Sequence, residues 1–219
     1  MKNEIEIWNS YNKLLLSEDI SRLRKIIARY ELFKETIKVP GDIVECGVFK
    51  GISFMFWLKC LKIYSPNSNK KVIGFDMFSG FPNSLNKIEK KSAKKYVKKS
   101  DFKGLDPNKL KVLASKISKE NKFELIKGDV SKTAKKYVDK NYGFKISLLH
   151  LDLDTYKGTK SALKYFYPKI SRGGIIILDE YASRGWGETQ AVDEFIKEKK
   201  YKVETLENTD SPTGYIKVI

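Results

Sequence analysis

The chain has few of the residues that build disulfide and zinc sites. Its 219 residues include 2 cysteines and 1 histidine. Cys46 and Cys60 are too few for a disulfide framework, and their spacing is not that of a zinc site. We therefore expect both thiols to be reduced and to serve only in packing.

Long hydrophobic runs are also missing. No apolar run approaches the roughly 18 residues that a membrane-spanning helix needs. Charged residues occupy the N-terminal segment MKNEIEIWNS, where a secretory signal peptide would have its apolar core. We therefore expect a cytoplasmic protein that does not insert into a membrane.

Arginine is scarce although the chain is strongly basic. Lysine and arginine number 43 against 27 acidic residues, which gives a formal net charge of +16. Only 5 of these basic residues are arginine, whereas nucleic-acid recognition favours the bidentate arginine fork. Between residues 86 and 122, 13 lysines stand against 4 acidic residues, a local net charge of +9. The basic excess favours anionic ligands, but the shortage of arginine argues against nucleic acid as the partner.

Five apolar runs alternate with helical patterns along the chain. This alternation is typical of a parallel sheet with helices on both faces, so the sequence predicts one α/β domain over residues 1–219. The predicted strands lie within residues 43–48, 71–78, 123–129, 146–154 and 174–181. Helices are expected near residues 51–61, 131–141, 157–168 and 187–198.

Three further segments extend this predicted domain. Amphipathic helices are expected within residues 1–39, and their apolar faces could form the contact of a homodimer. Residues 83–120 contain two helical patterns rich in lysine, which we interpret as an inserted helical lid. A solvated lysine face without a role is an equally weighted alternative. Residues 203–219 predict a terminal hairpin, which would bring the sheet to seven strands.

Acidic residues follow every predicted parallel strand. The carboxyl ends of such strands meet at one edge of the sheet, where α/β proteins bind their ligands. Clustered carboxylates are unfavourable unless hydroxyl groups, amides or a metal ion meet them. This edge is therefore the strongest functional signal in the sequence. Its acidic residues are Glu45, Asp76, Asp129, Asp152, Asp154, Asp179 and Glu180.

The turn after the first predicted strand indicates a cationic nucleoside ligand. Glu45 stands where a dinucleotide site has its first glycine, and its carboxylate would repel a pyrophosphate. Gly47 and Gly51 allow the backbone to approach a ligand and the helix to pack closely. Asp76 is placed to accept both hydroxyls of a ribose, and Asp129 could accept an exocyclic amine. Together these features indicate S-adenosylmethionine.

The fourth and fifth strands end in carboxylates that suit a hard cation. Asp152, Asp179 and Glu180 offer three oxygen donors, as Mg²⁺ or Ca²⁺ requires. Alternatively, Asp179 and Glu180 cap the next helix or pair with lysines. His150 lies deeper in the fourth strand, where a buried structural histidine is the alternative to a catalytic one.

Four motifs in this order resemble the macrocin O-methyltransferase family. They are ECGVFKG at residues 45–51, FDMFSGFP at 75–82, LDLDTYKGT at 151–159 and GGIIILDEY at 173–181, and AVDEF at 191–195 continues the match. The resemblance implies a class I methyltransferase with a Rossmann-like fold. Members of the family use S-adenosylmethionine and Mg²⁺ to methylate sugar hydroxyls, many of them on antibiotic glycosides.

The resemblance also implies roles for single residues. Asp152 is similar to a metal ligand of the family, and Asp154 is similar to its general base. Glu180 stands where a second aspartate is usual, and Leu153 where a glycine is common. The complete expected set comprises Asp154 and His150 for catalysis, Asp152, Asp179 and Glu180 for the metal, and Glu45, Gly47, Gly51, Ser53, Asp76, Ser79, Asp129 and Asp152 for the cofactor.

These inferences together predict an S-adenosylmethionine-dependent, Mg²⁺-assisted O-methyltransferase. Its acceptor would be a sugar hydroxyl on a nucleotide sugar, a glycan or a glycosylated natural product, and the lysine-rich segment favours an anionic one. Two alternatives are a nucleic-acid methyltransferase and a cofactor-binding module without catalysis. The first alternative lacks the Asn/Asp-Pro-Pro-aromatic motif that enzymes methylating base amines carry.

Overall fold

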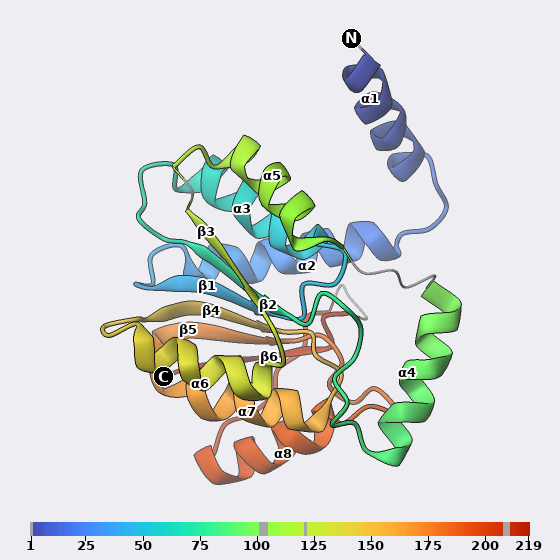
Figure 1. The fold of residues 1–219 in the computed structure, drawn as a ribbon. Coiled ribbons are helices and arrows are strands. Elements are labelled where there is room, and N and C mark those ends of the chain that lie inside the picture. The colour runs from blue at the N-terminus through green and yellow to red at the C-terminus, as the bar shows by residue number, and fades with distance from the viewer. Residues whose placement is uncertain (1, 101–104, 121, 208–210) are drawn as a thin grey trace.

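The computed structural model describes residues 2–100, 105–120, 122–207 and 211–219, which form a sheet between two layers of helices (Figure 1). Five strands are parallel and the sixth, at one edge, is antiparallel. The strand order is β3-β2-β1-β4-β5-β6, so the order reverses between β1 and β4. Ligands of doubly wound sheets bind at this reversal. The strands are β1 (Asp42–Cys46), β2 (Val72–Asp76), β3 (Phe123–Lys127), β4 (Ile146–Leu151), β5 (Ile170–Leu178) and β6 (Gly214–Lys217).

Helices cover both faces of the sheet, which confirms the predicted α/β class. One layer contains α2 (Ser21–Thr36), α3 (Ile52–Tyr64) and α5 (Pro107–Ile117). The opposite layer contains α6 (Val130–Lys140), α7 (Tyr156–Phe166) and α8 (Glu188–Lys199), and the short 3₁₀ helix η1 (Tyr167–Lys169) leads from α7 into β5. Two helices stand apart from these layers: α1 (Lys2–Leu15) and α4 (Lys87–Ser100).

Alternate side chains of the central strands face opposite layers. In β1, Val44 and Cys46 pack with the α6–α8 side, whereas Ile43 belongs to the core on the α2–α3 side. Every residue of β4 is buried, as expected of a parallel strand that is covered on both faces. Both cysteines are free and buried, as predicted.

Within the described residues the sheet has six strands, whereas seven were expected. Residues 203–206 contribute only one antiparallel bridge, between Glu204 and Tyr215. Val203 and Leu206 are partly buried against the two hydrophobic cores while Glu204 and Thr205 are exposed, so side-chain packing holds this segment in place of a continuous ladder. β6 instead pairs with β5, and residues 208–210 of the expected hairpin lie outside the described residues.

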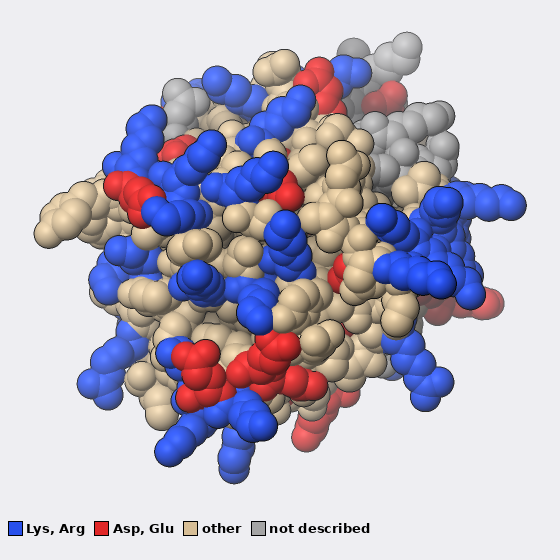
Figure 2. All heavy atoms as spheres, turned by 60° about the horizontal axis from the view of Figure 1, so that its bottom comes forward, with Lys and Arg blue, Asp and Glu red and all other residues tan. Residues whose placement is uncertain are grey.

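The lysine-rich segment divides into two helices with different positions. In α5, Leu110 and Ala114 are buried in the core beside α3, so this helix is part of the fold rather than of a lid. α4 lies outside the layers, near the carboxyl ends of the strands (Figure 1). Figure 2 shows basic side chains spread over one face of the molecule and crowded at its right edge, where Figure 1 places α4.

α1 extends away from the body of the protein (Figure 1) and carries an exposed apolar face. Ile5, Ile7 and Trp8 are each more than 60% exposed, and Tyr11 is 53% exposed. None of the described helices combines the length and the apolar character needed to cross a bilayer.

Candidate active site

Three charged side chains are buried together near the carboxyl ends of β1, β4 and β5. Glu45 and His150 are fully buried, and Asp179 is 2% exposed. Glu45 pairs with His150 in the register of β1 and β4, and Asp179 directly follows β5. Because the three side chains have the same parity in neighbouring strands, all of them point toward the layer of α2 and α3.

His150 lies between two carboxylates. Its Nε2 atom is 3.3 Å from Asp179 Oδ1, and its Nδ1 atom is 3.4 Å from Glu45 Oε1. Burial lowers the pKa of His150, but the bonds to Asp179 and Glu45 outweigh this effect and raise the pKa to about 9. Trp57 covers the ring edge-on at 5.8 Å. A charged imidazole therefore links β1 to the end of β5 through β4.

Asp179 is surrounded by donors. Oδ1 lies 3.3 Å from His150 Nε2 and 3.4 Å from an Arg29 guanidinium nitrogen. Oδ2 accepts from Lys25 Nζ at 3.1 Å and from Ser211 Oγ at 2.9 Å. Burial alone would raise the pKa of Asp179, but the His150 hydrogen bond and the neighbouring positive charges hold that pKa far below its usual range.

The other carboxylates at this edge lack such compensation. Burial, followed by the charge of Asp179, raises the pKa of Asp152 to about 7. Burial and the charge of Asp152 raise the pKa of Asp154 well above its usual range, and burial raises the pKa of Glu180 as well. Such groups are stabilised by a proton or by a cation placed among them.

The donor set fits a divalent metal ion. His150, Asp152 and Asp179 each have one possible ligand atom, and these atoms lie within 4.8 Å of one another. A charged His150 has a proton on both ring nitrogens and cannot bind a metal, so Asp152 and Asp179 are the donors that this group offers. The predicted set had Glu180 in place of His150. Glu180 instead bonds to Ser183 through its side chain, so only Asp152 and Asp179 of the predicted ligands are brought together. Carboxylate oxygens are the donors that Mg²⁺ prefers.

Glu188 is an acidic residue of this site that was not predicted from the sequence. It is fully buried, and its Oε1 atom accepts a hydrogen bond from the Glu180 backbone at 3.0 Å. Its Oε2 atom has no hydrogen-bond partner among the described residues. Burial, followed by the charges of Asp152 and Asp154, raises the pKa of Glu188 well above its usual range. A glutamate that starts a helix is ordinary in a sequence, so no signal could have identified it.

The first turn brings the expected cofactor residues next to the carboxylates. Gly47 has φ of +95°, and a Cβ at this position would collide with the backbone carbonyl of Asp152. Gly51 also has positive φ, at +80°, and precedes α3. In the first turns of α3, Ser53 Oγ donates a hydrogen bond to Glu45. The backbone after β1 therefore has to approach the end of β4 without a side chain between them.

Asp76 holds the first turn from the neighbouring strand. Its Oδ2 atom accepts from the backbone N–H groups of Val48 and Phe49, at 2.8 and 3.0 Å. Burial raises the pKa of Asp76 although these hydrogen bonds act in the opposite direction. Two other expected residues have local roles: Asp129 caps α6 by accepting from the Ser131 backbone, and Ser79 is exposed with its hydroxyl on the Met77 carbonyl.

α4 is fastened over this edge by its polar side chains. Glu89 is 3% exposed, and its Oε1 atom accepts from the Tyr156 backbone at 2.7 Å, just after Asp154 in the chain. Ser92 Oγ donates to the Gly185 carbonyl at 2.8 Å. The Asp154 carbonyl in turn accepts from the backbone N–H groups of Gly187 and Glu188. α4 and the loop before α8 therefore converge on the segment that contains Asp154.

An aromatic cluster lies beside the same edge. Trp186 stacks on Phe81 with ring centroids 5.6 Å apart, and Tyr96 of α4 meets Trp186 at 6.4 Å. Burial and the charge of Asp154 raise the pKa of Tyr96 to about 12.

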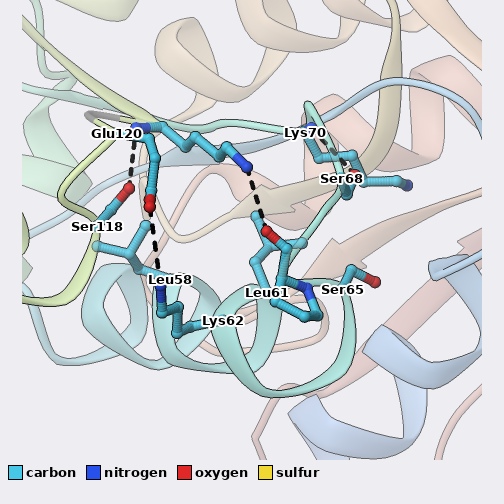
Figure 3. Close-up of a pocket in the computed structure, with 10 residues that line it drawn as sticks. Leu58, Leu61, Lys62, Ser65, Ser68, Lys70, Ser118 and Glu120 are labelled. Atoms are coloured by element: carbon cyan, nitrogen blue, oxygen red, sulfur yellow. Dashed lines mark hydrogen bonds and ion pairs between the residues drawn. The ribbon is translucent and has the colours of Figure 1, made fainter.

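A hollow of about 20 Å³ lies at the opposite end of the sheet (Figure 3). It is lined by the end of α3 and by residues that lead into β2 and β3. Lys62 and Glu120 of its lining form an ion pair at 4.0 Å, and Lys122 donates to the Pro66 carbonyl at 3.3 Å. This hollow is too small for a metabolite.

Comparison with known proteins identifies a family. A sequence model described as Macrocin-O-methyltransferase (TylF) matches residues 18–217. A tetracenomycin 4'-O-methyltransferase from Streptomyces olivaceus, acting on 8-demethyl-8-(2,3-dimethoxy-alpha-L-rhamnosyl)-tetracenomycin-C, is 25% identical over 147 residues, 66% of this chain and 54% of that protein. A mycinamicin III 3''-O-methyltransferase from Micromonospora griseorubida is 27% identical over 150 residues, 65% and 56% of the two chains. This chain thus spans about half the length of these curated relatives.

Solved structures show the same fold. The calicheamicin methyltransferase CalS11 superposes with a TM-score of 0.82 at 24% identity, over 94% of this chain and 83% of that one. The O-methyltransferase NovP superposes with a TM-score of 0.72 at 20% identity, over 89% and 79% of the two chains. At these identities the likeness concerns the architecture.

The contact between Gly47 and Asp152 can be tested by substitution. We expect Gly47→Ala to disturb the backbone of Asp152 and to abolish cofactor binding, because the new Cβ meets a carbonyl oxygen. Gly143→Ala is the matched control, since Gly143 also has positive φ, at +80°, but nothing lies within 4 Å of its Cβ position. Gly143→Ala should cost only about 1–2 kcal/mol of backbone strain. Calorimetric titration with S-adenosylmethionine and thermal unfolding would measure both effects, and equal cofactor affinities would contradict the proposed collision.

The attachment of α4 can be tested by proteolysis. We expect Glu89→Ala to release α4 and to speed tryptic cleavage at its exposed lysines by roughly tenfold, because proteases report local opening. Ile88→Ala is the control, since Ile88 is the preceding residue of the same helix and is 67% exposed. Mass spectrometry of a timed digest locates the cuts. A Glu89→Ala digest that matches the control would show that other contacts hold α4.

Proposed function

The chain belongs to the macrocin O-methyltransferase family, and we propose that it transfers the methyl group of S-adenosylmethionine to a sugar hydroxyl. The observation that carries this proposal is the close approach of Gly47, in the turn after β1, to the backbone carbonyl of Asp152, a residue that like Asp154 has an undercompensated carboxylate. A cationic methyl donor and an acidic edge are complementary in charge.

The cofactor would lie along the carboxyl ends of β1, β2 and β4. We assign Gly47 and Gly51 to close backbone approach, Asp76 to the ribose and Asp129 to the adenine amine. Glu45 and Ser53 bond to each other beneath the turn, so we propose that they shape its floor. Ser79 and Asp152 complete the proposed cofactor-binding residues.

A divalent metal, proposed to be Mg²⁺, would be held by Asp152 and Asp179. Glu180, the third donor expected from the sequence, would have to leave Ser183 to join them. When bound, such an ion polarises the acceptor hydroxyl and so lowers the pKa of that hydroxyl. His150 is fully buried between Glu45 and Asp179, so we propose that it positions Asp179 and does not touch the substrate, in contrast to the catalytic role expected from the sequence.

Asp154 is the proposed general base. Its raised pKa suits a group that receives a proton during the reaction, because an ordinary aspartate is a weaker base at neutral pH. Its backbone adopts φ of +60°, a conformation that is uncommon for a side chain other than glycine and is fixed here by the hydrogen bonds to its carbonyl. The base is thereby preorganised before the acceptor arrives.

We propose a sugar on a small molecule as the acceptor, since the name of the curated relative from Streptomyces olivaceus describes methylation of a compound that carries a rhamnosyl group. The lysines of α4 point into solvent, so they would meet an anionic part of the acceptor, such as a nucleotide, outside the reaction centre. A nucleic-acid acceptor is less favoured because arginine is scarce. The exposed apolar faces of α1 and α2 favour a homodimer.

Metal dependence separates this function from its alternatives. We expect EDTA to abolish methyl transfer to a nucleotide-sugar acceptor, with recovery on addition of Mg²⁺. Asp152→Ala should lower the rate by at least about 100-fold, since the hydroxyl then loses its activating ion. Transfer of radiolabelled methyl groups provides the measurement. Full activity in EDTA would rule out the metal-assisted reaction, and turnover of any sugar would exclude a non-catalytic module.

The base is tested by Asp154→Asn, which keeps the shape of the side chain and removes its basicity. We expect kcat to fall by about 10²–10⁴-fold, the usual contribution of general base catalysis, with little change in cofactor affinity. Single-turnover rates and calorimetric titration measure the two quantities separately. An active Asp154→Asn variant would show that the proton leaves by another route.

A further inference from the structure

We propose that Lys25 is an exchangeable counter-ion of Asp179, and that a divalent metal displaces its ammonium group when the metal binds. The proposal rests on the proposed function only in assuming that a divalent cation binds at Asp152 and Asp179. It adds a residue of α2 to the site, 154 positions away from Asp179 in the chain.

The carboxylate of Asp179 has no vacant lone pair to offer. A carboxylate has about four lone-pair positions, and four groups occupy those of Asp179. Asp179 can therefore act as a metal ligand only if one of these groups leaves.

Lys25 is the group best able to leave. Its side chain is 27% exposed, whereas that of Arg29 is 10% exposed and His150 is fully buried. A lysine ammonium is a strongly hydrated point charge on a flexible side chain, so water solvates the charge readily once the ammonium group has left Asp179. Ser211 is uncharged and so would not be driven out by repulsion from the metal.

Electrostatics supports exchange over simultaneous binding. An ammonium group 3.1 Å from Asp179 Oδ2 would lie within a few ångströms of a metal on the same carboxylate, where like charges repel strongly. Without the metal, the ammonium group lowers the cost of burying Asp179 next to Asp152 and Asp154. The metal and Lys25 thus perform the same electrostatic task, and each should weaken the binding of the other.

Direct metal binding tests the exchange without any catalysis. Titration with Mn²⁺, followed by electron paramagnetic resonance in the absence of cofactor and acceptor, would compare the wild-type protein with three lysine variants and with Asp152→Ala. We expect Lys25→Met to bind Mn²⁺ about tenfold more tightly, within the usual range of coupling between two sites. Lys25→Arg should stay near the wild-type affinity, because it keeps the competing charge. Lys34→Met is the matched control, since Lys34 is an exposed lysine of the same helix.

Thermal unfolding supplies a second measurement. In EDTA, Lys25→Met should melt below the wild-type protein, because Asp179 has lost a cation. At saturating Mn²⁺ the difference should shrink or disappear, since a ligand that binds the native state more tightly stabilises it more. Lys34→Met should show neither effect.

The outcomes separate this inference from the proposed function. If the wild-type protein binds Mn²⁺, Asp152→Ala abolishes that binding and Lys25→Met binds no more tightly than the wild type, the exchange is wrong while the metal site stands. If the wild type binds Mn²⁺ no better than Asp152→Ala does, both the exchange and the metal-assisted reaction are wrong.

Discussion

The bridge that His150 makes between Glu45 and Asp179 is the constraint on which the rest of the site depends. It places a charged imidazole and two carboxylates at the centre of the sheet, where water cannot solvate them. Removing one member of a buried charged pair typically costs about 3–5 kcal/mol, because the remaining charge is left uncompensated. The three residues therefore have to be retained together, and they fix the carboxyl ends of β1, β4 and β5 relative to one another.

The carboxylates of the acidic edge differ in how well neighbouring groups compensate their charge. Asp179 has a full set of donors and a depressed pKa, whereas Asp152 and Asp154 have raised pKa values and little compensation. A uniformly compensated edge would hold neither a cationic cofactor nor a metal, because nothing would be gained by adding positive charge. The shortfall around Asp152 and Asp154 is therefore the feature that makes the edge a binding site.

Much of this arrangement could be predicted from the sequence, because it follows from local patterns. The apolar runs fix the strands, and parallel strands must bring their carboxyl ends to one edge, so strand pattern alone places Asp152 near Asp179. Lys25, Arg29 and Glu188 could not be predicted, because only tertiary packing brings them to Asp179 or Glu180. The predictions of a seventh strand and of a lid made of two helices were wrong for a related reason. Burial, and not local pattern, decides whether residues 203–206 pair fully and whether α5 joins the core.

Helix α4, the loop before α8 and the proposed base Asp154 are joined by hydrogen bonds to the backbone of residues 154–156. Glu89 of α4 bonds to the Tyr156 backbone, and the loop before α8 bonds to the Asp154 carbonyl two residues earlier. The uncommon backbone conformation of Asp154 is thus held from two sides, by α4 and by the loop before α8. If α4 is the lid that the sequence predicts, its closure would exclude water and align the proposed base in the same step.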